Sequence, residues 1–217
     1  MLDDISANLI PIILLLVTGF VALVMASLLI LDYLKNKKVY HLAWAISFLV
    51  LFVSGVLIIL FGYNILSQPL VPVVAAFIPA CLVIGLFFAT WDDKPYGLYY
   101  TIFTIFMVAV LAIVRLLPDL ADFSTPVLMG LHIPSGLAIV GIPLYTALTK
   151  KTEMTSLFYS IGGLLISIGG ILLAISKTNA EVEELTFAVL PLLLVIVGVF
   201  FVLGILLPSE WKAEIPF

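Results

Sequence analysis

The chain contains very little charge for its length. Lysine, arginine, aspartate and glutamate together make up 10% of its 217 residues, against about 25% in an average soluble domain. Hydrophobic residues make up 64% of the chain, and the mean hydropathy is +1.34. A soluble domain averages about 45–50% apolar residues. This composition therefore predicts a protein whose surroundings are mostly lipid.

The chain is also poor in the residues that build metal, redox and nucleic-acid sites. A single cysteine, Cys81, excludes an intrachain disulfide. The histidines, His41 and His132, belong to no Cys/His cluster with zinc spacing, and the few basic residues form no stripe that would bind a nucleic acid. We therefore predict no metal, no cofactor and no nucleic-acid partner. An intramembrane enzyme ranks last, because it would need His, Asp or Glu clustered at one depth, and no catalytic motif is present.

Seven apolar stretches are each long enough to cross a bilayer, for which a helix needs roughly 20 residues. They lie at about residues 9–33, 42–62, 70–90, 98–117, 127–148, 157–176 and 186–207. The first stretch follows an acidic N-terminus and exceeds the apolar core of a signal peptide, so we interpret it as a membrane helix. Because the connections are short, the sequence predicts an all-α, multi-pass membrane protein with one seven-helix domain over residues 1–217.

The basic residues predict how this bundle is oriented, because cytoplasmic loops are enriched in lysine and arginine. With the N-terminus outside, the inner side collects most of them: Lys35, Lys37, Lys38, Lys94, Lys150, Lys151 and Lys212. The outer side then has only Arg115 and Lys177, and its loops are acidic instead. The sequence thus predicts a plasma-membrane protein with its N-terminus outside and its C-terminus inside.

The three segments before residues 98–117 resemble the three after it. Residues 76–84 match 188–196 at an offset of 112, and residues 46–60 match 161–175 at an offset of 115. Any membrane chain matches aliphatic residues by chance, but aligned prolines and paired small residues are less expected. We interpret the pattern as a duplication in a 3+1+3 layout. Both copies start on the same side, so the repeat would be parallel, and the unpaired segment would return the chain across the bilayer.

This layout resembles that of the SWEET sugar transporters and looks like that of the microbial opsins. The resemblance covers all seven segments as an architecture and almost no residues. The seventh segment, 186–207, contains no lysine for a retinal Schiff base, and the single glutamine, Gln68, precedes a proline in a loop instead of following one. Neither family's functional residues are carried over to this chain.

Few ionisable residues lie within the predicted spans, and an ionisable residue inside a membrane is a functional candidate by default. Arg115 closes the fourth span, and His132 lies in the fifth, with Ser135 one turn deeper. Asp119 and Asp122 occupy the outer loop between these spans. These five residues would form one outward-facing ligand site. The alternative is structural: Arg115 would reach the lipid headgroups, and His132 would bond a neighbouring helix.

Two further features carry predictions about motion and packing. Pro79 and Pro191 fall at matching positions of the two triplets and are candidate hinges. The sixth span presents small residues on one face, which let helices approach closely. That face, which packs either within the bundle or between subunits, consists of Gly163, Ser167, Gly170 and Ala174.

The weak polar lining favours one class of function over the others. We predict that the protein binds or transports a small apolar or weakly polar molecule in a pocket between its halves. The alternative is a sensory or scaffold subunit without transport. Besides the lipid bilayer, the candidate partners are therefore a small-molecule ligand, a second copy of the chain, or another membrane protein.

Overall fold

The computed structural model describes residues 2–176 and 180–208, and within them the chain is helical and contains no strand. Its longer helices are α1 (Leu2–Asn36), α2 (Val39–Phe61), α4 (Phe77–Thr90), α5 (Tyr96–Leu116), α6 (Ser124–Leu148), α7 (Leu157–Ser176) and α8 (Ala180–Leu206). Its shorter ones are η1 (Tyr63–Ser67), α3 (Leu70–Ala75), η2 (Pro118–Phe123) and η3 (Met154–Ser156).

Seven helical spans in the described part of the chain are long and apolar enough to cross a membrane. They run over Leu9–Asn36, Val39–Phe61, Leu70–Thr90, Tyr96–Leu116, Pro118–Leu148, Met154–Leu172 and Ala188–Leu206. Each overlaps one stretch predicted from the sequence. The prediction of seven apolar membrane-length helices is therefore confirmed.

The third span differs from its prediction, because it is two helices and not one. α3 ends at Ala75 and α4 begins at Phe77. The break comes just before Pro79, whose ring removes one backbone donor and crowds the carbonyl four residues earlier. Pro191, by contrast, lies inside the unbroken helix α8. The two prolines therefore have different local structures, and the paired-hinge hypothesis stays a prediction.

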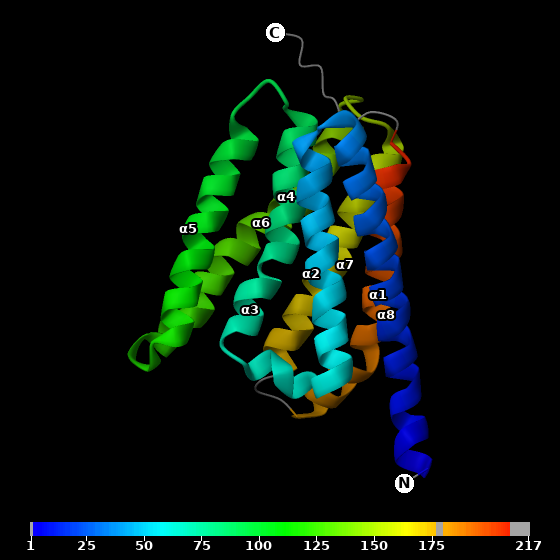
Figure 1. Cartoon of the computed structure of the whole chain (residues 1–217), viewed down its shortest axis with the longest axis vertical. Helices are drawn as coiled ribbons and strands as arrows, with labels where there is room; N and C mark the ends of the chain where they lie inside the picture. Colours follow the sequence, from blue (N-terminus) through cyan, green and yellow to red (C-terminus); the bar gives the residue numbers. More distant parts are fainter. Residues whose placement is uncertain (1, 177–179, 209–217) are drawn as a thin grey trace.

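The long helices form a ring in which sequence neighbours pack side by side (Figure 1). α2 packs against both α1 and α4, and α7 packs against both α6 and α8. α5 stands at one side of the ring, against α3, α4 and α6. Contact between α1 and α8 closes the circle.

The bundle has two different ends, which we call the lysine end and the η2 end. The lysine end, at the top of Figure 1, holds the connections 37–38, 91–95 and 149–153 and the described lysines. The η2 end, at the bottom, holds η1 and η2. Lys177 and Lys212, which the orientation prediction also uses, lie outside the described residues.

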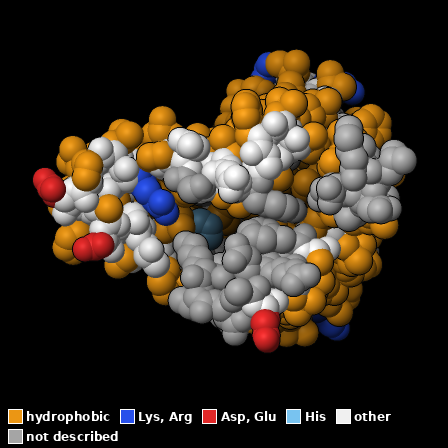
Figure 2. Space-filling model, turned by 90° about the horizontal axis from the view of Figure 1, so that it is seen from below, with side chains coloured by type: hydrophobic (Ala, Val, Ile, Leu, Met, Phe, Trp, Pro, Cys, Tyr) orange, Lys and Arg blue, Asp and Glu red, His pale blue; other side chains and the backbone are white. Residues whose placement is uncertain are grey.

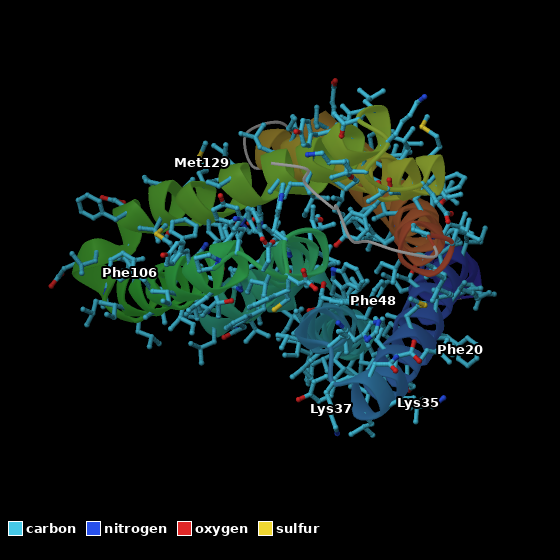
Figure 3. The ribbon with its side chains drawn as sticks, turned by 90° about the horizontal axis from the view of Figure 1, so that it is seen from above. Phe20, Lys35, Lys37, Phe48, Phe106 and Met129 are labelled. Carbon is cyan, nitrogen blue, oxygen red and sulfur yellow. The ribbon has the colours of Figure 1, made fainter. Side chains whose placement is uncertain are left out.

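Two clusters of buried hydrophobic side chains hold the helices together. The larger one joins α1, α2, α4, α6, α7 and α8, and Phe48 lies inside it (Figure 3). The smaller one joins α3, α4, α5 and α6 around Leu111 and Leu131. Phe20 and Phe106, in contrast, point away from the bundle at its perimeter (Figure 3). An apolar perimeter of this kind suits a lipid environment.

The helix ends at the lysine end are stabilised by local contacts. Lys37 and Lys150 have φ values of 56° and 57°, a left-handed conformation that commonly follows the last turn of a helix. The ammonium of Lys37 lies over the ring of Tyr33, and that of Lys151 lies over Tyr145, 5.6 and 5.1 Å from the ring centroids. α1 and α6 therefore end in similar ways.

Buried hydroxyls fix the connection between α6 and α7. The hydroxyl of Thr152 donates to Oγ1 of Thr146 across 3.0 Å and lies 2.9 Å from Oγ of Ser156. The backbone N–H groups of Lys151 and Thr152 both donate to the carbonyl of Thr146. The buried hydroxyls of this connection are therefore hydrogen-bonded within the protein, as buried polar groups generally are.

The small-residue face of α7 packs within the bundle over part of its length. A Cβ atom added to Gly163 would collide with the side chain of Ile139 on α6, so the two helices cross closely here. One added to Gly170 would meet nothing within 4 Å. The side chain of Ala174 lies outside the described residues.

Candidate binding site at the η2 end

Arg115 lies in the last turn of α5, on the face that packs against the smaller core cluster. Its neighbours on that face, Leu111 and Val114, are buried. The Arg115 side chain is half-buried, and its Nε atom is buried without a hydrogen-bond partner among the described residues. A buried N–H that lacks an acceptor costs free energy. This guanidinium is therefore a candidate to bind an acceptor brought by a ligand.

The structure does not pair Arg115 with the loop carboxylates. Asp119 and Asp122 lie on η2 and are exposed. Among the described residues, the recorded ion pair joins Lys94 to Asp93 at 3.5 Å, at the opposite end of the bundle. The predicted convergence of the guanidinium with these carboxylates is therefore not observed as an ion pair.

His132 lies on α6, about two turns from the start of the helix. Its Nδ1 atom is 3.2 Å from the carbonyl oxygen of Leu128 on the same helix. When Nδ1 carries the proton and donates it to this carbonyl, Nε2 is left as an acceptor. The side chain is exposed, so this second nitrogen is open to a ligand.

Ser135 braces two helices instead of facing a ligand. It is fully buried, and its hydroxyl donates to the carbonyl of Leu131 at 2.6 Å. Because a hydroxyl has one proton, Tyr100 must be the donor in the 2.7 Å bond between its own hydroxyl and Oγ of Ser135. The hydrogen bonds therefore tie α5 to α6 at Ser135, one turn deeper than His132.

The surface at the η2 end is hollowed. Figure 2 shows this hollow. It lies between a lobe, which is formed by α5, η2 and the start of α6, and the rest of the bundle. A histidine side chain is visible in the hollow and a basic side chain beside it on the lobe, whereas acidic side chains lie away from the hollow, on the outer side of the lobe and at the edge of the main bundle. The hollow follows from the helix packing, because α6 meets α7 at Gly136 and Gly163 but Gly170 meets nothing. α6 and α7 thus separate toward the η2 end.

A second depression lies on the membrane-facing surface between α1 and α8. It is an open groove of about 210 Å³. Its lining is entirely hydrophobic: Phe20, Val21, Val24, Met25, Leu28, Val202 and Leu206. A groove without a polar group gives no basis for orienting a polar ligand. It suits the hydrocarbon of the surrounding lipid.

The other candidates of the sequence have local packing roles. Cys81 is buried in the interior of the bundle. His41 lies at the lysine end with its ring 4.3 Å from that of Tyr40, far along the bundle from His132. Among the described residues, no group of three or more His, Cys, Asp or Glu side chains is placed to hold a metal ion.

Sequence reasoning missed one buried contact among three helices. The carbonyl oxygen of Leu82 on α4 accepts hydrogen bonds from Trp44 on α2 and Tyr159 on α7. The acceptor is a backbone atom, which has no signature in the sequence. The signal that was available was an aromatic residue near the start of the second and sixth spans.

No protein-family model, no curated protein and no solved structure matches this chain.

Proposed function

We propose that the protein binds a small, mainly apolar molecule with one acceptor group in the hollow at the η2 end and carries it across the membrane. The observation that supports this most is the contrast between the two ends. The η2 end is hollowed beside a guanidinium with a buried, unpartnered Nε. The larger core cluster includes Trp44 and Tyr159 near the lysine end. A cavity open on one side only is the form that an alternating-access carrier adopts.

The proposed orientation follows the distribution of lysine. The lysine end faces the cytoplasm, because positively charged loops are retained there during insertion. The hollow then opens to the outside of the plasma membrane, and the N-terminus lies on that side. Exposed Asp119 and Asp122 at the η2 end agree with this orientation, since neither adds positive charge to it.

The proposed repeat is supported by matching local structures in the two triplets. The middle helix of each triplet packs against both of its neighbours. Lys37 and Lys150, whose backbones are left-handed, follow the first helix of each triplet and lie 113 positions apart. The second and sixth membrane-length spans begin at Val39 and Met154, which are 115 positions apart. These spacings fall within those of the sequence matches, as a parallel duplication requires.

The chemistry of the hollow restricts the ligand. Arg115 offers a charged donor, and His132 offers one nitrogen whose role depends on its tautomer. A lack of partners alone would not mark a site, since Thr90 at the lysine end also has a buried oxygen without one. Arg115 differs because it always carries a full positive charge. We therefore propose a ligand with a carboxylate or another strong acceptor and an apolar body.

Native mass spectrometry of the protein released from detergent micelles tests this proposal. We expect a bound molecule of defined mass on the wild-type protein. Its occupancy should fall by about tenfold or more in Arg115→Gln, because a charged hydrogen bond contributes about 1.5–3 kcal/mol. His132→Ala should reduce occupancy less. Asp119→Asn is the control and should retain the molecule fully.

Two outcomes would contradict the proposal. One is a wild-type protein that carries no small molecule, which would favour the sensory or scaffold alternative. The other is equal retention in wild type, Arg115→Gln and His132→Ala, which would place any bound molecule elsewhere on the protein.

A further inference from the structure

Three helices meet at one backbone atom near the lysine end. The indole Nε1 of Trp44 donates to the carbonyl oxygen of Leu82 across 3.1 Å, and the hydroxyl of Tyr159 donates to the same oxygen across 3.0 Å. Trp44 is 1% exposed and Tyr159 is 0% exposed. Their ring centroids are 6.1 Å apart. The two side chains thus converge from α2 and α7 on one point of α4.

Two glycines make this convergence sterically feasible. A Cβ atom at Gly85 on α4 would collide with the indole of Trp44. One at Gly204 on α8 would lie 2.8 Å from Cα of Tyr159 and closer still to its backbone nitrogen. Real Cβ atoms essentially never approach other atoms so closely. The contact therefore depends on the absence of a side chain at both positions, one in each triplet.

Trp44 and Tyr159 occupy equivalent positions of the proposed repeat. They are 115 positions apart, the same spacing that aligns residues 46–60 with 161–175. Each lies near the lysine end of the middle helix of its triplet. A parallel repeat is related by an axis along the membrane normal, so equivalent residues lie at the same depth. Two such residues that touch each other lie next to that axis.

We propose that Trp44 and Tyr159, joined through the Leu82 carbonyl, form the gate that closes the lysine end of the transport path. This inference rests on the proposed function, and it assigns the residues that must separate when the carrier opens to the other side. In the closed state the pair blocks the lysine end, so the cavity is open only at the η2 end.

The hydrogen bonding of the gate allows it to open. The Leu82 carbonyl lies within α4, where it also accepts the regular helical bond from the fourth residue along the chain. It therefore stays satisfied when both side chains leave. The indole N–H and the phenol lose their acceptor, but water that enters the opened path replaces it. If the acceptor were a side chain instead of a helix carbonyl, the acceptor would also lose its hydrogen bonds when the gate opens.

The single cysteine of the chain provides a probe that needs no knowledge of the ligand. Cys81 is 4% exposed and immediately precedes Leu82 on α4. The experiment measures how fast a membrane-impermeant maleimide labels Cys81 in sealed vesicles, applied from the lysine end. The variants are Tyr159→Phe, which removes one oxygen, and Trp44→Phe, which removes the indole donor. We expect labelling to rise about threefold to tenfold in each, because one hydrogen bond shifts such an equilibrium by roughly this factor.

Two neighbouring residues provide matched controls. Ser47 on α2 donates to the carbonyl of Ile78 on α4 at 2.8 Å, and Ser160 on α7 donates to the carbonyl of Val140 on α6 at 2.8 Å. Ser47→Ala and Ser160→Ala each remove one bond of the same kind from the same helices, but neither residue belongs to the pair. Both controls should label at the wild-type rate, and a melting curve in detergent confirms that each variant is folded.

The outcomes separate the gate from the proposed function. Faster labelling in Tyr159→Phe and Trp44→Phe alone supports the gate. Unchanged labelling in these two variants, or an equal rise in all four, overturns it. If Trp44→Phe does not fold, Tyr159→Phe decides alone. Ligand retention by native mass spectrometry is measured separately, so a failed gate with a retained ligand leaves the binding function standing.

Discussion

The two ends of the bundle are built from similar residues but packed differently. At the lysine end, Gly85, Gly163 and Gly204 bring helices into direct contact, and buried hydroxyls such as that of Thr152 bond to each other. At the η2 end, Gly130 and Gly169 also lie against side chains of neighbouring helices, but Gly170 meets nothing within 4 Å, and the Nε of Arg115 has no partner among the described residues. The difference teaches that a small residue does not by itself bring helices together. Its effect depends on whether a second helix crosses at that depth.

The largest expected effect concerns the contact between α7 and α8. In Gly204→Ala, the new methyl group would collide with the backbone of Tyr159, which cannot rotate away. We expect a loss of about 3 kcal/mol of stability, at the upper end for overpacking, measured as a large fall in melting temperature in detergent.

Gly198 on the same helix provides the control for that substitution. A Cβ at this position meets nothing within 4 Å. Gly198→Ala should keep or raise the melting temperature, because alanine favours a helix. A melting temperature that falls equally in both variants would contradict the tight α7–α8 contact.

A second pair of substitutions compares the two ends on one helix. Gly163→Ala would push a methyl group into Ile139, a side chain that can adjust, so we expect a loss of about 1–2 kcal/mol. Gly170→Ala, two turns along α7, should be neutral. Thermal unfolding of both variants in detergent measures the difference. Equal destabilisation would show that the hollow between α6 and α7 is closed in the protein.

A smaller effect is expected from the hydroxyls at the lysine end. Thr152→Val removes the bonds to Thr146 and Ser156 at nearly constant volume and should cost about 1 kcal/mol. Thr149→Val is the control, because its exposed hydroxyl bonds only its own helix. Thermal unfolding should distinguish them, and an unaffected Thr152→Val would argue that water replaces these bonds.

The smallest effect is expected at the lipid-facing rim of the lysine end. Tyr145→Leu removes the cation–π contact with Lys151 and a 3.3 Å hydrogen bond from its ammonium, both at an exposed site. We expect a change below about 1 kcal/mol. A melting temperature that falls as far as in Gly204→Ala would show that this contact is buried, for example against a partner.

The spans were predictable from the sequence because the bilayer sets their length, and a continuous apolar stretch of that length is visible in the sequence without knowledge of any tertiary contact. The break before Pro79 was not predictable from the sequence. Pro134, Pro143 and Pro191 lie inside unbroken helices, so a proline alone does not indicate a break. A proline permits an interruption, and packing decides whether one occurs. The same limit applies to Ser135. Its residue type and its depth suit a ligand site, but its hydroxyl is hydrogen-bonded to that of Tyr100 on another helix.

The contact between α1 and α8 has a consequence for biogenesis. Each of the other helices packs on a neighbour that has already been synthesised, so the ring can assemble stepwise as the spans enter the membrane. Only insertion of α8 brings Gly204 against Tyr159. Before that step Tyr159 lacks one wall of its pocket, and the bundle is an open arc. Such an arc is the species on which membrane quality control would act, and its lifetime is set by how fast α8 inserts.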